Sequence, residues 1–192
     1  MMKAVTEGLY NQQVKDRGID PTATLAKCFE LQSNYSGTSG ELLIKRIMSE
    51  KGAKVINEDV THDFYDVKAS YDGLSEKTYE IKTARMDLNG NFQFDGITPE
   101  NEFDFIILLA VKPEGILFNM QHRSSFSTLI DESNGPYAGK KRWKLFKKLT
   151  PMHKGTLDGG LKLTMSQKDL NTYGFEPLDE LACDKIISSL KV

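Results

Sequence analysis

The chain has 192 residues, of which 39% are hydrophobic and 27% are charged, and its formal net charge is −2. This composition supports a packed core and excludes a disordered chain, and the near-zero charge makes any contact with a polyanion depend on a local patch. Two distant cysteines, Cys28 and Cys183, exclude a disulfide framework and a cysteine-type zinc finger. The longest run without charged or strongly polar residues, Phe105–Val111, is far shorter than the about 20 apolar residues of a membrane span. We therefore expect a cytoplasmic protein without membrane contact.

The N-terminal part predicts two helical segments. Residues 1–37 form the first, which ends in a turn rich in serine and glycine. An amphipathic helix follows at about 40–51, since its apolar residues recur at helical spacing: Leu43, Ile44, Ile47 and Met48. Thr38 or Ser39 could cap this helix, which would place Glu41 in the first turn.

The middle of the chain predicts β-strands. An Asp72-Gly73 pair favours a tight turn between two of them. The segment Phe103–Val111 is almost continuously apolar, which is typical of a strand buried on both faces. The turn at 112–115 would pair it with the next strand as a hairpin. The expected strands are residues 53–56, 64–71, 77–83, 103–111 and 116–121.

The rest of the chain predicts a short helix at 125–130, an irregular stretch at 131–160 and a last helix at 177–192. We expect one α/β domain with a central mixed β-sheet flanked by α-helices. Within it we distinguish an N-terminal helical segment (1–37), a core (38–130), and a basic segment with the C-terminal helix (131–192).

The hairpin at 66–82 carries the most informative polar residues. If it turns about Gly73, residues whose numbers sum to 146 face one another, and Asp66 lies opposite Glu80. Lys82 shares a face with Glu80 because strand side chains alternate. A loop one residue longer or shorter would turn Asp66 to the other face, and Asp63 is then a rival acid.

Two neighbouring carboxylates repel each other, and a hard divalent cation that keeps water ligands relieves this repulsion. A lysine beside the cation can position a water molecule and stabilise developing negative charge. The chemistry that such a group supports is phosphodiester hydrolysis.

This pattern resembles the PD-(D/E)XK nuclease superfamily, which includes many type II restriction endonucleases. Asp66 matches the first acid, although Tyr65 stands where the family often has proline, and Glu80-Ile81-Lys82 matches the second half. Glu41 matches a helical glutamate that many members aim at the metal, and Gln93 a glutamine found in some members. For Glu41 a first-turn partner of the helix dipole remains equally open, and Gln93 can be an ordinary surface amide.

The resemblance implies a restriction-endonuclease-like core. It implies Mg²⁺, with Mn²⁺ as a substitute, held by Asp66, Glu80 and Glu41, and cleavage of double-stranded DNA that leaves a 5′-phosphate. The catalytic residues would be Asp66, Glu80 and Lys82. Cutting both strands needs a homodimer or a second subunit.

A second signal is electrostatic. Residues 137–154 hold seven lysines and arginines and no acid, which leaves the rest of the chain at −9. A helix would place Trp143, Phe146 and Leu149 on one side and the basic residues in solvent. Phosphate contact is the expected role of this segment, with Arg85 nearer the acids. The candidate DNA-binding residues are Arg85, Gln93, Lys140, Lys141, Arg142, Lys144, Lys147 and Lys148.

Other functions remain open. The chain could bind DNA without cutting it, as a module or as an accessory of a nuclease complex. It could be a structure-specific resolvase or repair nuclease. It could also be an interaction protein that works through its terminal helices and has no affinity for DNA, in which case the basic segment is only a solvated face.

Overall fold

The computed structural model of the protein describes residues 19–20, 22–26, 29, 33–56, 64–98, 101–123, 128–130, 141–143, 149–153 and 156–192. Its helices are α2 (Ser33–Glu50), α3 (Gln167–Thr172) and α4 (Glu180–Ser189). The strands of the main sheet are β1 (Lys54–Ile56), β2 (Val67–Ser70), β3 (Lys77–Arg85), β5 (Phe105–Lys112), β6 (Gly115–His122) and β11 (Glu176–Pro177). The remaining strands are β4 (Asn91–Ile97), β7 (Thr128–Ile130), β8 (Lys141–Trp143), β9 (Leu149–His153) and β10 (Thr156–Ser166).

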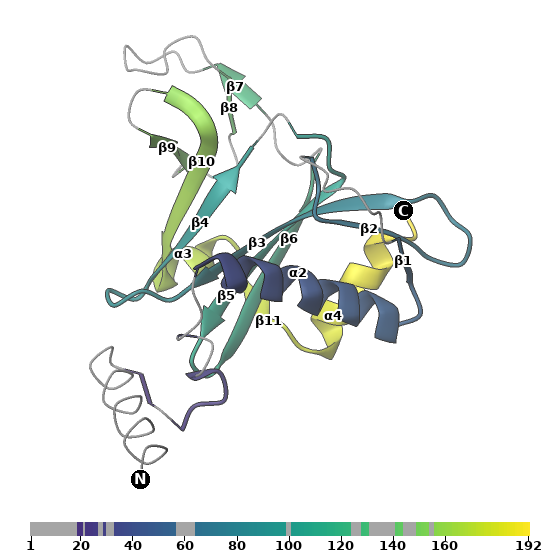
Figure 1. Ribbon diagram of the computed structural model, residues 1–192, viewed down its shortest axis with the longest axis horizontal. Helices are drawn as coiled ribbons and strands as arrows, with labels where there is room; N and C mark the ends of the chain where they lie inside the picture. Colours follow the sequence, from purple (N-terminus) through teal and green to yellow (C-terminus); the bar gives the residue numbers. More distant parts are fainter. Residues whose placement is uncertain are drawn as a thin grey trace.

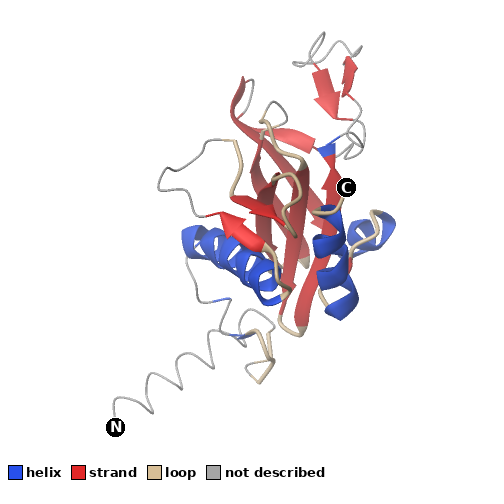
Figure 2. Ribbon diagram, turned by 90° about the vertical axis from the view of Figure 1, so that its right-hand side faces the viewer, coloured by secondary structure: helices blue, strands red, loops and turns tan. Residues whose placement is uncertain are grey.

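The main sheet is mixed, as the sequence predicts. Its strand order is β1-β2-β3-β5-β6-β11, in which β3 and β5 run parallel and the other neighbours antiparallel. A three-stranded sheet, β4-β10-β9, and the β7-β8 pair stand beside it (Figure 1). Helices pack against the main sheet (Figure 2). None of the helices in the described ranges is long and apolar enough to cross a membrane.

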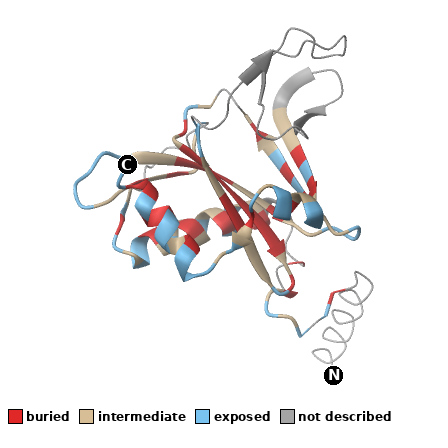
Figure 3. Ribbon diagram, turned by 180° about the vertical axis from the view of Figure 1, so that it is seen from behind, coloured by how far each residue is buried: buried red, intermediate tan, exposed pale blue. Residues whose placement is uncertain are grey.

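Strand β5 divides the core into two layers. Phe105, Ile107 and Leu109 face the helices α2 and α4. Ile106, Leu108 and Ala110 face the opposite side, where they pack with apolar residues of β4, β10 and α3. All six are buried, so the predicted strand with two buried faces is confirmed (Figure 3). The predicted hairpin with β6 is also confirmed.

Helix α2 begins earlier than predicted. It starts at Ser33, so the expected turn before residue 38 is helical and neither Thr38 nor Ser39 is its N-cap. Glu41 therefore lies in the interior of the helix rather than in its first turn, which removes its interpretation as a dipole partner. Of the expected helical segment at 1–37, residues 22–26 form a turn and short 3₁₀ structure, and most of the others before Ser33 lie outside the described residues.

Several predictions for the C-terminal half were wrong. Residues 128–130 form a strand, not part of a short helix. The stretch at 131–160 contains β8, β9 and the start of β10. Because residues 141–143 and 149–153 are strands, the basic segment is not one continuous helix. Strand β4 and helix α3 were not predicted, whereas α4 confirms the last predicted helix.

Gly40 sets how closely α2 approaches the sheet. A Cβ added at this position would lie 3.2 Å from Thr83 Cβ and 3.3 Å from Leu109 Cδ1, and it would also overlap Thr83 Oγ1. A side chain at Gly37, one helical turn earlier, would meet no atom within 4 Å. The two glycines therefore form a matched pair for testing the helix–sheet contact.

We expect Gly40→Ala to lower the free energy of unfolding by about 1–3 kcal/mol, because the added methyl group forces α2 away from β3 and β5. Gly37→Ala should raise it by about 0.5–1 kcal/mol, since alanine favours the helix and nothing opposes its side chain. Urea unfolding of both variants measures the difference. Equal effects of the two substitutions would show that Gly40 is not a close contact.

Candidate active site

The β2–β3 hairpin has the predicted register. Val67 pairs with Tyr79, and Lys68 with Thr78, so paired residue numbers sum to 146. The Asp66 N–H donates to the Tyr79 carbonyl at 2.9 Å. The next donor along β3, the Ile81 N–H, bonds instead to Asp66 Oδ2 at 2.6 Å. The carboxylate of Asp66 thus accepts a backbone N–H of β3 at the point where strand pairing ends, which fixes its position beside β3.

Glu80 and Lys82 form an ion pair on the adjacent strand. Glu80 is only 4% exposed, and Lys82 Nζ lies 2.6 Å from Glu80 Oε1. Burial raises the pKa of Glu80, the nearby Lys82 ammonium lowers it, and the charge of Asp66 raises it again. The lysine therefore helps to keep a buried carboxylate charged next to a second carboxylate.

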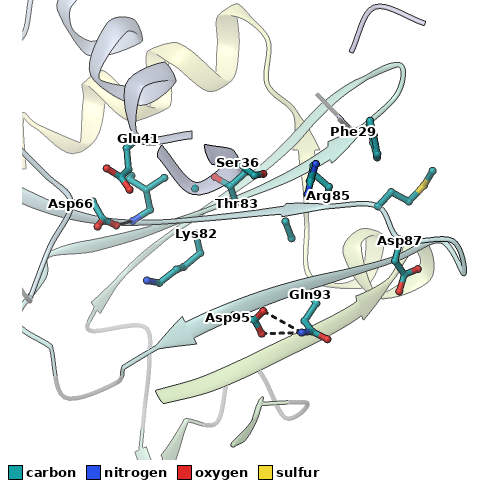
Figure 4. Close-up of a pocket in the computed structure, with 14 residues that line it drawn as sticks. Phe29, Ser36, Glu41, Asp66, Lys82, Thr83, Arg85, Asp87, Gln93 and Asp95 are labelled. Carbon is teal, nitrogen blue, oxygen red and sulfur yellow. Dashed lines mark hydrogen bonds between the residues drawn. The ribbon is translucent and has the colours of Figure 1, made fainter. Parts of the chain in front are cut away.

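Helix α2 adds a third acid to this group. Glu41 projects from the interior of the helix toward Asp66 (Figure 4). Burial is the main cause that raises the pKa of Glu41, and the charge of Asp66 raises it further, while Lys45 and Lys82 lower it. The three acids Glu41, Asp66 and Glu80 therefore influence one another, as the sequence analysis expected.

Asp66 and Lys82 line a cleft of about 620 Å³. One wall is formed by α2 and β3, and the other by the exposed side chains of β4 (Figure 4). The lining residues include four acids and two bases: Glu41, Asp66, Asp87 and Asp95, and Lys82 and Arg85. The cleft is thus acidic, although its walls hold cationic groups that could contact a phosphate.

Gln93 and Asp95 stand on the far wall of the cleft. Gln93 Nε2 donates to both carboxylate oxygens of Asp95, at 3.1 Å each (Figure 4). A β-bulge follows them, because Asp95 and Gly96 together lie opposite Lys162 in the pairing of β4 with β10. Gly96 has a φ of +69°, and Lys82 Nζ would lie 3.8 Å from a Cβ at this position. The bulge therefore brings the β4 backbone close to the lysine.

The structure brings together most of the expected site residues. Glu41, Asp66, Lys82, Arg85 and Gln93 all line the cleft. Glu80 does not line it, but its carboxylate forms an ion pair with Lys82, which does. Lys141 and Arg142 are residues of strand β8. The other predicted DNA-binding lysines lie outside the described residues: Lys140, Lys144, Lys147 and Lys148. Asp63, the rival acid, also lies outside them.

Four polar residues that line the cleft were not predicted: Ser36, Thr83, Asp87 and Asp95. For Asp95 a signal was present, since Phe92, Gln93, Phe94 and Asp95 alternate between apolar and polar. Ser36 was assigned to a turn, and it could be recognised only once the helix was known to begin at Ser33.

The cleft offers carboxylate ligands for a hard cation such as Mg²⁺, but not a complete set of them. Carboxylate oxygens are suitable ligands, and Mg²⁺ often takes only one or two of them and keeps water for the rest. Among the described ranges, no group of three or more His, Cys, Asp and Glu side chains is arranged to hold a metal ion. The donor set therefore suits an ion held by two carboxylates and completed by water, rather than a preformed cage.

Comparisons with known proteins show similarity to a solved nuclease structure. No family model and no curated protein matches the chain. The chain is similar to the structure of a bacterial homing endonuclease, I-Ssp6803I, with 15% identity and a TM-score of 0.47 over 83% of this chain and 97% of the other.

Replacement of Lys82 tests the charge balance of the buried pair. Lys82→Met removes the cation that lowers the pKa of Glu80, so this pKa rises further above its unfolded value near 4.5. An acid with a raised folded pKa binds more protons in the native state than in the unfolded state, and stability falls as pH rises between the two values. We expect the variant to lose about 1–3 kcal/mol relative to the native sequence at neutral pH, and much less at pH 4.5.

Urea unfolding at several pH values between 4.5 and 8 measures this loss. The control is the double variant Glu80→Gln with Lys82→Met, in which no carboxylate remains to be protonated at this position. In this double variant, the extra dependence of stability on pH that Lys82→Met shows should disappear. Parallel stability curves for the native sequence and Lys82→Met would contradict the coupling.

Proposed function

We propose that this chain is a metal-dependent endonuclease that hydrolyses phosphodiester bonds of double-stranded DNA. The observation that carries the proposal is the union of Glu41, Asp66 and Lys82 in one cleft, with Glu80 bonded to the lysine. Three separate parts of the chain contribute these residues: helix α2, the residue just before β2, and β3. A convergence of acids around one lysine is costly for stability, and it supports a role in chemistry.

In this proposal Asp66 and Glu80 hold Mg²⁺, with Glu41 as a helper, and Mn²⁺ can replace it. The acidity of the cleft supports the part of this assignment that concerns Asp66 and Glu41, because both line it and a phosphate would otherwise be repelled. Glu80 is included because its carboxylate pairs with Lys82, which lines the cleft. When bound, the ion would neutralise phosphate charge and acidify a water ligand.

The side chains of the cleft have distinct roles. Lys82 donates hydrogen bonds to the attacking water or to the phosphate oxygen on which negative charge develops. Arg85 contacts a neighbouring phosphate from the same strand, β3. Water oxygen bonds to phosphorus as the bond from phosphorus to the 3′ oxygen breaks. The water loses one proton and the leaving 3′ oxygen gains one, which gives a 3′-hydroxyl and a 5′-phosphate.

Contact with the duplex backbone would come from the basic segment at 137–154, which holds seven lysines and arginines and no acid. Such contacts give affinity without sequence preference. We further propose site-specific cleavage of both strands, as in type II restriction endonucleases. One such cleft cuts one strand, so the proposal includes a homodimer or a second subunit.

Cleavage of supercoiled plasmid and phage DNA tests the function. We expect cutting in Mg²⁺ or Mn²⁺ and none in EDTA. Asp66→Asn and Lys82→Ala should each reduce the rate at least ~100-fold, since each removes charge that acts on the transition state. The measurement is the rate of product formation on agarose gels, with gel retardation as a separate readout of DNA binding.

Matched controls are available in the same hairpin. Asp72→Asn changes an exposed acid at the turn, where its φ of +51° suits asparagine equally well. Lys77→Ala removes a lysine from the start of β3. Both controls should cut at the native rate. Undiminished cutting by Asp66→Asn or Lys82→Ala would show that the chemistry occurs elsewhere, and gel retardation without cutting would favour a DNA-binding protein.

Metal binding can be measured apart from activity. At about ten times the dissociation constant, a bound ion adds about 1.4 kcal/mol to the stability of the native state. For a chain of this length we expect Mg²⁺ to raise the thermal midpoint by about 3–5 °C. The shift should vanish in Asp66→Asn and persist in Asp72→Asn. An equal shift in both variants would place the ion away from Asp66.

A further inference from the structure

The strands β4 and β10 form an antiparallel ribbon with two different faces. Phe92, Phe94, Leu163 and Met165 are fully buried against the main sheet. The side chains between them are all polar: Gln93, Asp95, Lys162 and Thr164. Gln93, Asp95 and Thr164 are exposed and Lys162 is partly exposed. The core explains the inward face, whereas the outward side chains are not part of the core clusters formed by the described residues.

The bulge at Asp95 and Gly96 keeps these faces separate. Ile97 is buried with Phe92 and Phe94, although simple alternation would place it beside Gln93 and Asp95. The extra residue restores Ile97 to the core and leaves the outward face free of apolar side chains. The chain thus maintains a polar surface here through a local change of register.

The outward face is continuous with the proposed catalytic cleft. Gln93 and Asp95 belong to both, because they line the cleft opposite Asp66 and Lys82 (Figure 4). A duplex with one phosphate in the cleft would therefore extend over the ribbon. On the other side of β10, β9 pairs with it, and β9 follows Lys147 and Lys148 of the basic segment directly in the sequence.

The dimensions of a β-ribbon match those of DNA. The major groove is about 12 Å wide and admits a two-stranded ribbon. Residues two apart on a strand are about 6.8 Å apart, which is close to two base-pair steps of about 3.4 Å. Gln93 and Asp95 are two residues apart on β4. Their outward side chains can therefore reach base pairs that are two steps apart along the DNA.

The residue types also match the groups that the groove presents. A glutamine amide pairs with adenine, a lysine with guanine, a carboxylate accepts from the cytosine amino group, and threonine offers a hydroxyl and a methyl. The bonds from Gln93 Nε2 to Asp95 restrict the orientation of the amide. An amide has a second N–H and an oxygen, which are the groups that recognise adenine.

We propose that Gln93, Asp95, Lys162 and Thr164, on the outward face of the β4–β10 ribbon, read base edges in the major groove of the DNA. The inference rests on the proposed function and adds to it the surface that determines sequence preference. Phosphate contacts of the basic segment position the duplex, and the ribbon discriminates between sequences.

The test is digestion of a randomised duplex library with Mg²⁺, followed by sequencing of the ends. The native chain should show preferred bases at defined distances from the cut. Gln93→Ala should reduce the preference at one of these positions about 10- to 100-fold and leave the others in place. Lys162→Met and Thr164→Val should each relax a different position. The three changed side chains point outward, and circular dichroism verifies that the variants fold.

Lys168→Met and Thr172→Val on α3 are matched controls, since both residues are exposed and lie away from the ribbon face. Both should retain the full base preference. Preferences that survive all three ribbon variants would overturn the inference while the nuclease function stands, as would cutting by the native chain without any preference. A change of sedimentation in the ribbon variants with unchanged preferences would assign the face to a second copy and also overturn it. Absence of both cutting and binding by the native chain would overturn the proposed function itself.

Discussion

The site depends on the way in which β3 is held between a buried strand and a short hairpin partner. β3 runs parallel to β5, and its odd-numbered residues Tyr79 and Ile81 face the core formed with α2 and α4. This packing fixes Glu80 and Lys82 on the opposite face. On that face Glu80 is almost inaccessible to water, and its pairing with Lys82 offsets much of the cost of burying a charge.

The end of strand pairing places the second acid. The pairing of β2 with β3 ends at Val67, next to Asp66. Beyond this point the Ile81 N–H donates to the Asp66 side chain at 2.6 Å. A carboxylate held by a backbone N–H loses little further conformational entropy when it binds a ligand. Helix α2 can approach this point because Gly40 allows close contact with Thr83. The close contact of α2 with β3 at Gly40 therefore both packs the helix on the sheet and brings Glu41 near Asp66.

Local patterns predicted the parts of the fold in which neighbours in sequence are neighbours in space. The register of the 66–82 hairpin follows from the position of Gly73, and the burial of 105–111 from an unbroken apolar run. Asp72 adopts a positive φ in the turn, as its pairing with glycine indicates. With these elements, the proximity of Asp66, Glu80 and Lys82 could be expected from the sequence alone.

Predictions were wrong where distant segments decide the structure. β4 pairs with β10, about 70 residues away, and its alternation is broken by the bulge before Ile97. The helical pattern of Trp143, Phe146 and Leu149 was misleading, because Leu149 belongs to β9, which pairs with β10. The start of α2 was missed because serine and glycine at 33–40 favour turns locally, whereas packing of Gly40 on β3 supports a helix there.

Separation of charge is a constraint that the proposed function explains. The described cleft is acidic, with four acids and two bases among its lining residues, whereas a single segment, 137–154, holds seven bases and no acid. A protein that only bound DNA would gain nothing from acids at the point where a phosphate approaches. A nuclease needs them there to attract a cation, and it must then obtain its affinity for the backbone from elsewhere in the chain. In the proposed nuclease, the acids of the cleft would bind the cation and the bases of the segment would bind the DNA backbone.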